Sequence, residues 1–200
     1  MSLRPKIWQS LEDMSTTEHS VELEFTPNPN TLKYTTDVAF MLAGAENFKS
    51  VNDAIERSPL AAELFKLEGI AGVMVGKNFV TVTLTNQDAL TELNEQIITT
   101  IKNFLKTGQK AVIPSDVVPQ ATVGRNDAEQ MIINLLDNEI RPAVAMDGGD
   151  ITFERYENGV VFLHMKGACS GCPSSTATLK MGIENRLREM IPDLVEVVAI

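Results

Sequence analysis

Two cysteines, Cys169 and Cys172, are the residues of this chain whose type and spacing most directly suggest chemistry. They are the only cysteines in the sequence and lie in the stretch GACSGCP, residues 167–173. Thiols at this C-x-x-C spacing can form a reversible disulfide, supply half of a tetrahedral zinc site, or donate two thiolates to an iron–sulfur cluster. They can also be structural thiols in a turn.

The residues around the cysteines favour the binding of a soft anion. Pro173 is followed by apolar residues at helical spacing, which predicts that a helix begins there and that Cys172 lies at its mouth. Unpaired amide groups at a helix start stabilise a thiolate. Gly167 and Gly171 leave room for backbone amides to approach a sulfur ligand. We therefore expect a loop that holds soft anions, not a buried thiol pair.

The alternatives differ in how well they suit this loop. A dithiol oxidoreductase of thioredoxin type usually has proline or glycine between its cysteines and an aromatic residue before them, whereas here Ser170-Gly171 lies between and Ala168 precedes. A structural zinc site needs a second pair of ligands, and the histidines, His19 and His164, are far apart in the sequence. An iron–sulfur cluster is favoured, but it requires four thiolates and one chain offers two.

This shortage of thiolates predicts a homodimer. Two copies of the loop, brought together about a two-fold axis, would supply four thiolates to one shared cluster. Such a cluster would have few protein ligands, would lie close to solvent and would be easy to give away. The runner-up, a dithiol–disulfide oxidoreductase, predicts a monomeric, metal-free protein with a readily formed intramolecular disulfide.

The elements that position the cysteine loop belong to a small C-terminal domain. A helix is predicted from about Asp127, and Arg141-Pro142 ends or kinks it. Residues 146–150, MDGGD, favour a turn over a carboxylate metal site. The remaining predicted elements are a hairpin with strands at 151–156 and 160–165 about Asn158-Gly159, the helix after the cysteines, and a final strand at 194–200.

The first half of the chain predicts a second small sheet with helices and contains no cysteine. Residues 26–34, TPNPNTLKY, have two prolines and two asparagines and are typical of a turn, with a recognition surface as the alternative. The other predicted elements are a strand at 21–25, a short helix at 51–55, a helix capped by Ser58 and stopped by Gly69, a hairpin with strands at 70–75 and 79–84, and a long helix from Leu90 to Leu105 that Gly108 closes.

Composition limits the class of partner and the cellular location. The 200 residues carry a net charge of −10, which argues against nucleic acid or an anionic membrane surface as a partner. No apolar run is long enough for a membrane span, and the first residues lack a signal-peptide core. A reducing cytoplasm suits free thiols and is the expected location.

Together these patterns predict an α+β (α/β) fold of two small domains, each a small sheet with helices packed on one face, joined by a linker. The boundaries that we expect are a lead-in at residues 1–19, an N-terminal domain at 20–107, a linker at 108–124 and a C-terminal domain at 125–200. Apolar residues of the lead-in have the spacing of one short amphipathic helix: Ile7, Trp8, Leu11 and Met14.

The motifs of both domains resemble one known family. Residues 146–150 (MDGGD), 167–176 (GACSGCPSST) and 178–184 (TLKMGIE) are similar to the C-terminal domain of NifU-like (Nfu-type) iron–sulfur cluster proteins. The first half resembles the Nfu N-terminal domain through residues 27–34 (PNPNTLKY), 58–61 (SPLA) and Gly72-Val73. The resemblance extends from about Val21 to Val198, and the C-terminal motif is the more specific of the two.

The resemblance implies a carrier, not an enzyme. Proteins of this family hold a labile [4Fe-4S] cluster, sometimes [2Fe-2S], between the C-x-x-C loops of two subunits and pass it to apo-proteins. By this match Cys169 and Cys172 are the iron ligands, and the N-terminal domain helps in meeting client apo-proteins and upstream cluster-assembly proteins. The lead-in is longer than the family pattern, and the desulfurase-interacting and ferredoxin-like domains of full NifU are absent, which implies a role late in cluster assembly.

Overall fold

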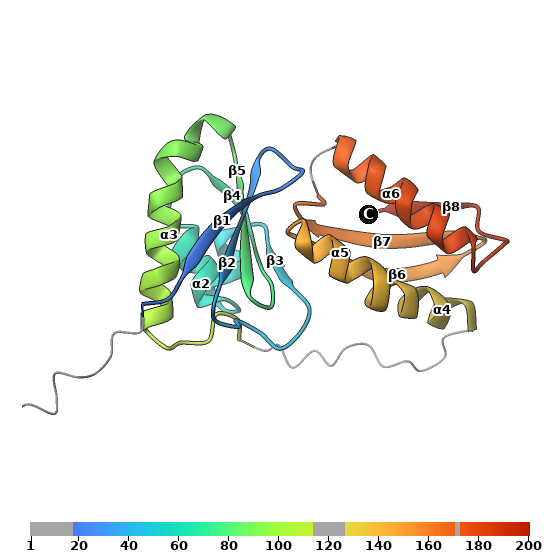
Figure 1. The fold of residues 1–200 in the computed structure, drawn as a ribbon, viewed down its shortest axis with the longest axis horizontal. Coiled ribbons are helices and arrows are strands. Elements are labelled where there is room, and N and C mark those ends of the chain that lie inside the picture. The colour runs from blue at the N-terminus through green and yellow to red at the C-terminus, as the bar shows by residue number, and fades with distance from the viewer. Residues whose placement is uncertain (1–17, 114–126, 171–172) are drawn as a thin grey trace, which may run out of the picture.

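The computed structural model describes residues 18–113, 127–170 and 173–200 (Figure 1). These residues form two separate sheets, each with its own hydrophobic core. We call residues 18–113 the N-terminal domain and residues 127–200 the C-terminal domain. The α+β class, with two small sheet-and-helix domains, is confirmed. The predicted amphipathic lead-in helix lies outside the described residues.

The N-terminal domain is a five-stranded sheet in the order β1-β2-β5-β4-β3, in which every neighbouring pair is antiparallel. Its helices pack on one face, where α3 contributes the buried residues Leu93, Ile97 and Ile101 to the core. In chain order its elements are β1 (Val21–Phe25), β2 (Thr31–Thr36), β3 (Glu46–Phe48), α1 (Val51–Ile55), α2 (Pro59–Leu64), β4 (Ile70–Val75), β5 (Phe79–Leu84), η2 (Gln87–Ala89) and α3 (Leu90–Lys106).

Ser58 caps α2 as its sequence predicts. Its hydroxyl oxygen accepts a hydrogen bond from the Ala61 amide at 3.1 Å and donates one to the Ala111 carbonyl at 2.6 Å. Ala111 is buried in the N-terminal core although it falls within the stretch predicted as linker, residues 108–124. The first residues after α3 therefore pack back on their own domain, and residues 114–124 of the predicted linker lie outside the described ranges.

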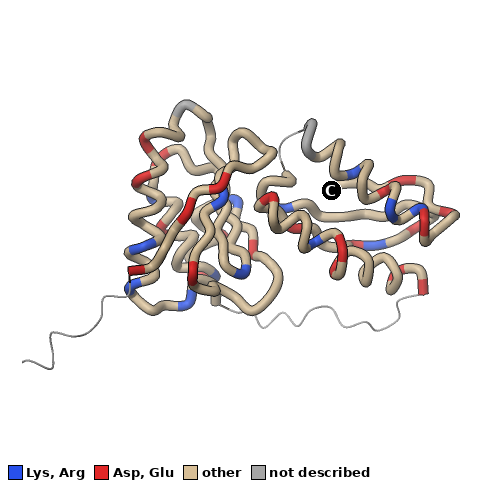
Figure 2. Tube along the Cα trace, viewed as in Figure 1, with Lys and Arg blue, Asp and Glu red and all other residues tan. Residues whose placement is uncertain are grey.

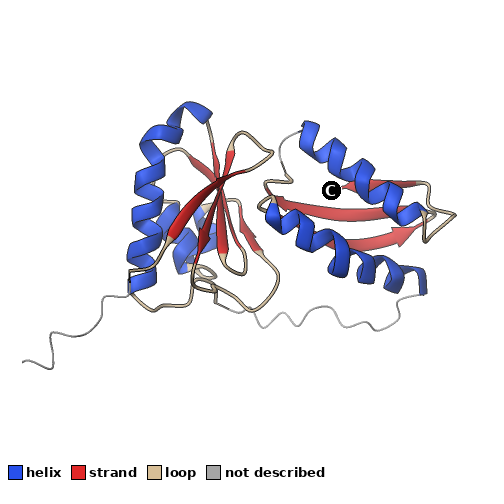
Figure 3. Ribbon diagram, viewed as in Figure 1, coloured by secondary structure: helices blue, strands red, loops and turns tan. Residues whose placement is uncertain are grey.

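The C-terminal domain is a three-stranded sheet, β6-β7-β8, in which β6 and β7 are antiparallel and β7 and β8 are parallel. Figure 3 shows its helices side by side over one face of that sheet. The β6–β7 hairpin turns at Asn158 and Gly159, which both have positive φ, as its sequence predicts. The elements are α4 (Asp127–Leu135), the π-helical segment η3 (Leu136–Ile140), α5 (Arg141–Met146), β6 (Gly149–Glu157), β7 (Val160–Gly167), α6 (Pro173–Arg188) and β8 (Glu196–Ala199).

In Figure 1 the two domains lie with the N-terminal sheet toward the C-terminal domain and α3 on the far side. Figure 2 shows acidic and basic residues interleaved along both domains. None of the described helices is both long enough and apolar enough to span a membrane.

Candidate functional site

The cysteine loop begins where β7 ends. Gly167 has a φ of +62°, and a Cβ atom at this position would lie 2.6 Å from the Gly148 carbonyl oxygen, so glycine is required. The amide and hydroxyl of Ser170 both donate to the Gly167 carbonyl, at 3.1 and 2.9 Å. Thr176, in the first turn of α6, donates to the Cys169 carbonyl at 3.0 Å. The loop is thus fixed both to the end of β7 and to the start of α6.

Cys169 differs from the expectation of a solvent-facing sulfur. It is 6% exposed and belongs to the C-terminal core. Its Sγ lies against β6, where a Cβ atom on Gly149 would come within 2.2 Å of it. Burial, with smaller contributions from Asp147 and Asp150, raises the pKa of Cys169 to about 12.

Cys172 and Gly171 lie outside the described residues. The predicted position of Cys172 at the mouth of α6 therefore stays a prediction. Pro173 is the first residue of α6, as its sequence predicts.

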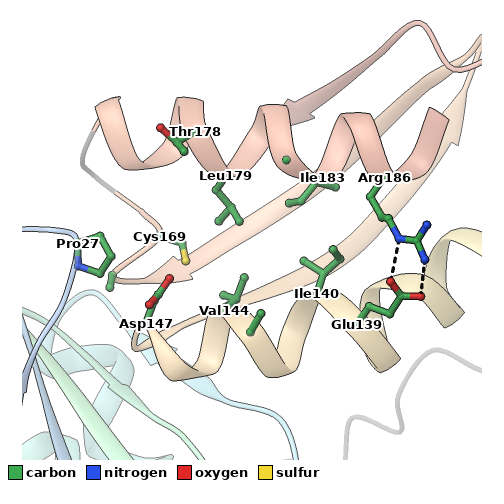
Figure 4. A pocket seen from close by; sticks show the side chains of 13 residues that line it. Pro27, Glu139, Ile140, Val144, Asp147, Cys169, Thr178, Leu179, Ile183 and Arg186 are labelled. Carbon is green, nitrogen blue, oxygen red and sulfur yellow. Dashed lines mark hydrogen bonds and ion pairs between the residues drawn. The ribbon is translucent and has the colours of Figure 1, made fainter. Parts of the chain in front are cut away.

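A cavity of about 740 Å³ lies between α5 and α6 and reaches Cys169 (Figure 4). Asp147 lies beside Cys169 at one end. At the other end Glu139 and Arg186 form a two-bond ion pair, with Nε–Oε2 and Nη2–Oε1 distances of 2.9 and 3.1 Å, and these hydrogen bonds lower the pKa of Glu139. The apolar residues of the wall are Ile140, Ala143, Val144, Leu179, Gly182 and Ile183.

A buried ion pair supports the turn that precedes β6. Asp150 is 5% exposed and receives two hydrogen bonds from Arg141, at 2.8 and 3.1 Å. Arg141 also donates to Asp137 at 2.9 Å, and these bonds raise its pKa. The predicted turn at MDGGD is confirmed by the positive φ of Gly148, whereas the structural role of Asp150 escaped the sequence analysis. The sequence pattern that accompanies this ion pair is an arginine nine residues before an aspartate, and such a pair is too common to predict a contact.

The N-terminal domain also contributes to the site. Pro27 lines the cavity, and the side-chain amide of Asn28 donates to the Ser170 carbonyl at 3.0 Å. From the sequence, residues 26–34 were predicted to form a turn, with a recognition surface as the alternative. The structure places them beside the cysteine loop.

Neither histidine has Cys169 as its partner. His19 lies 3.5 Å from Asp37 in the N-terminal domain, and His164 lies 3.1 Å from Glu154 on the C-terminal hairpin. Within the described ranges, no group of three or more histidine, cysteine, aspartate or glutamate side chains is arranged to hold a metal ion.

Both halves of the chain match models of known domains. Residues 21–108 match the domain described as "Scaffold protein Nfu/NifU N terminal", and residues 132–198 match the NifU-like domain. The two matches follow the order of the N-terminal and C-terminal domains and together cover most of the chain.

Curated relatives match across both domains. The Homo sapiens protein "NFU1 iron-sulfur cluster scaffold homolog, mitochondrial" is 37% identical over 178 residues, which cover 87% of this chain and 69% of that protein. The Arabidopsis thaliana protein "NifU-like protein 4, mitochondrial" is 37% identical over 180 residues, which cover 87% of this chain and 63% of that protein. A solution NMR structure of a NifU-like protein from Saccharomyces cerevisiae is 20% identical, with a TM-score of 0.45, and covers 50% of this chain and 90% of its own. On the domain matches and the curated relatives, this chain belongs to the Nfu/NifU-like family of scaffold proteins.

Proposed function

We propose that this chain is an iron–sulfur cluster scaffold and carrier, which binds a labile cluster through Cys169 and Cys172 and passes it to apo-proteins. The observation that carries the proposal is the C-x-x-C motif, which holds the chain's only cysteines and lies in the region that matches the NifU-like domain. The printed name of the human relative, an iron-sulfur cluster scaffold homolog, supports the same chemistry.

The proposed cargo is a [4Fe-4S] cluster shared by two subunits. Each chain has two thiols, and a cluster of this type takes four thiolates, so a homodimer about a two-fold axis satisfies the count. A [2Fe-2S] cluster can be held by the same four thiolates.

The environment of Cys169 helps to explain why the cluster would be labile. A thiol must lose its proton to bind iron, and the raised pKa of Cys169 means that the metal-free loop favours the protonated form. A client that offers its own thiolates replaces Cys169 and Cys172 at the iron atoms by ligand exchange. Each released thiolate regains a proton, and the buried thiol re-forms. The step is a transfer of cargo and not enzymatic catalysis.

The proposed partners follow from this chemistry. They are apo-proteins with free cysteines that accept the cluster, and upstream proteins that supply it. The expected location is a reducing compartment, for which the cytoplasm is our proposal. The names of the human and Arabidopsis relatives describe those proteins as mitochondrial.

The alternative function, a dithiol–disulfide oxidoreductase, needs a cysteine that attacks as a thiolate. Burial and the raised pKa of Cys169 argue against this cysteine as the attacking group. What supports the carrier over the oxidoreductase is the match of both domains to the Nfu/NifU-like family.

Single substitutions test the ligand assignment. Cys169→Ser and Cys172→Ser should each abolish the binding of a full cluster, because a serine hydroxyl is a poor ligand for iron in place of a thiolate. Iron and sulfide per chain after anaerobic reconstitution are the measurement, with a circular dichroism spectrum to show that the fold is kept. Met181→Ser, at an exposed position of α6, is the control and should bind cluster as the parent does. A complete cluster in either cysteine variant contradicts the assignment.

A further inference from the structure

One row of side chains crosses the N-terminal sheet on the face away from its helices. Lys33 of β2 is paired with Thr81 of β5, which is in turn paired with Met74 of β4. None of the three belongs to the N-terminal core, yet they are only 7%, 1% and 1% exposed. Because the helices lie on the other face, a different part of the chain must bury this row.

That part is the end of the C-terminal domain that bears the cysteine loop. A Cβ atom on Gly148 would lie 2.7 Å from the Thr81 methyl group and 3.3 Å from Lys33 Cβ. One on Gly167 would lie 2.6 Å from the Met74 methyl group. Two glycines with positive φ therefore place the C-terminal backbone directly on the N-terminal sheet, closer than any other residue would allow.

Two buried polar side chains of the N-terminal domain donate hydrogen bonds across this contact. The Asn28 amide, on a residue 3% exposed, reaches the Ser170 carbonyl at 3.0 Å. Lys33 Nζ reaches the Met146 carbonyl at the end of α5 at 2.9 Å and Glu24 at 2.7 Å. Buried polar groups are costly unless they are paired, so these two donors make the contact specific in position and orientation.

The hydrogen bond from Asn28 reaches the cysteine loop between its two cysteines, because Ser170 directly follows Cys169 and precedes Cys172. We propose that Asn28 and Lys33 are positioning residues that dock the cysteine loop on the N-terminal sheet, and that this docked state competes with the pairing of two cysteine loops around a cluster. The second half of the proposal rests on the proposed function.

The competition follows from the space around the loop. Cys169 is 6% exposed within the C-terminal core, and the docked N-terminal domain adds Pro27 to the wall of the cavity that reaches it and Asn28 as the donor to the neighbouring carbonyl. Four thiolates can reach one cluster only if both loops turn their cysteines toward each other. The loop must therefore change its contacts, and the N-terminal domain stabilises the metal-free arrangement.

Asn28→Asp is the sharpest variant. The Asn28 Oδ1 atom accepts a hydrogen bond from the Asn30 amide at 3.1 Å, and an aspartate keeps this acceptor, so the local turn is retained. The variant loses only the amide donor and sets a carboxylate against the Ser170 carbonyl. Asn30→Ala, at an exposed position in the same turn, is the matched control. Lys33→Met keeps the aliphatic stem, removes the second donor and provides an independent variant, with Lys77→Met as its exposed control.

The first measurement is the rotational correlation time of each domain in the metal-free monomer, from ¹⁵N relaxation. The parent and both controls should tumble as one body, whereas Asn28→Asp and Lys33→Met should each shift the docking equilibrium toward independent domains by about tenfold. Melting curves establish that both domains of the variants are folded. If the two variants and their controls have equal rotational correlation times, Asn28 and Lys33 do not dock the domains. The docking role is also wrong if the domains of the parent tumble independently.

The second measurement is the fraction of cluster-bridged dimer at limiting iron and sulfide, by mass in solution. Asn28→Asp should form the dimer at a lower iron concentration than Asn30→Ala by a similar factor. If Asn28→Asp separates the domains but needs the same iron concentration as Asn30→Ala to form the dimer, docking does not compete with cluster binding. The docking role of Asn28 is kept in that case. If the parent binds no cluster at all, the proposed function fails, and the tumbling measurement still decides the docking.

Discussion

The setting of Cys169 in the structure differs from the one that the proposed cluster binding requires. In the metal-free chain it is a buried thiol against Gly149, and its pKa is raised to about 12. As the proposed cluster ligand it would be an accessible thiolate. The free energy needed to move between these settings would lower the affinity for the cluster, which suits the proposed carrier role.

The ion pair of Arg141 and Asp150 supports the turn before β6. Arg141→Met should lower the free energy of unfolding by about 1–3 kcal/mol, because the Asp150 carboxylate is buried and loses its hydrogen-bond donors, while the Arg141 side chain is itself 28% exposed. Urea unfolding is the measurement. Lys66→Met, at the exposed ion pair with Glu63, is the control and should cost less than about 1 kcal/mol. Equal losses in the two variants contradict the buried-pair interpretation.

The buried Tyr34 should make the stability of the N-terminal domain fall at alkaline pH. Tyr34 is fully buried, its hydroxyl donates to Asn94 at 3.2 Å, and burial raises its pKa above the ordinary value of 10.0. Its contribution to stability is therefore fully present below about pH 10 and is lost as the pH rises further. Urea midpoints of the N-terminal domain should fall above that pH in the parent and fall less in Tyr34→Phe. Tyr156→Phe, in the other domain, is the control, and an identical alkaline loss in Tyr34→Phe contradicts the assignment.

At the scale of elements, local signals predicted most of the fold. The Ser58 cap, the two hairpins and the amphipathic helix α3 are each encoded within a few neighbouring residues, and the structure confirms them. Two strands were missed. β2 was predicted as part of the preceding turn because the prolines and asparagines just before it are strong turn signals, although Thr31, Lys33 and Thr35 alternate with Leu32 and Tyr34 as in a strand. β3 has only three residues.

The helix that opens the C-terminal domain changes its type just before Pro142. The sequence predicted that Arg141-Pro142 ends or kinks it. The helical path does not end there, because the chain continues through the π-helical segment η3 into α5, with the proline in the first turn of α5. The wider π turn precedes the proline and removes the clash that its ring would make inside a regular helix.

Two glycines of the C-terminal domain should respond oppositely to alanine. Gly148→Ala should destabilise the protein by about 1–3 kcal/mol, because its φ is +77° and a Cβ atom would lie 2.7 Å from Thr81. Gly182→Ala should stabilise it by about 0.5–1 kcal/mol, because Gly182 is inside α6 with nothing within 4 Å of a Cβ atom. Thermal unfolding of both variants is the measurement. Effects of the same sign contradict the backbone account.

At the scale of the whole molecule, the candidate site was only partly predictable from the sequence. The C-x-x-C motif is a local pattern and pointed to Cys169. The contributions of Pro27 and Asn28 depend on a contact between residues 142 positions apart, which no local pattern encodes. The burial of Cys169 likewise depends on packing between β6, β7 and the helices.

The acidic charge of the whole chain bears on its partners. A net charge of −10 disfavours attraction to the negative charge of nucleic acid. Figure 2 shows the two signs of charge interleaved along both domains.

Anaerobic reconstitution of the parent with iron and sulfide tests the central claim most directly, with the visible spectrum, iron and sulfide per chain, and mass in solution measured on one sample. The account predicts a broad brown absorption with about two irons and two sulfides per chain, which appears together with a dimer. A colourless monomer that reduces protein disulfides would contradict it and would favour the oxidoreductase.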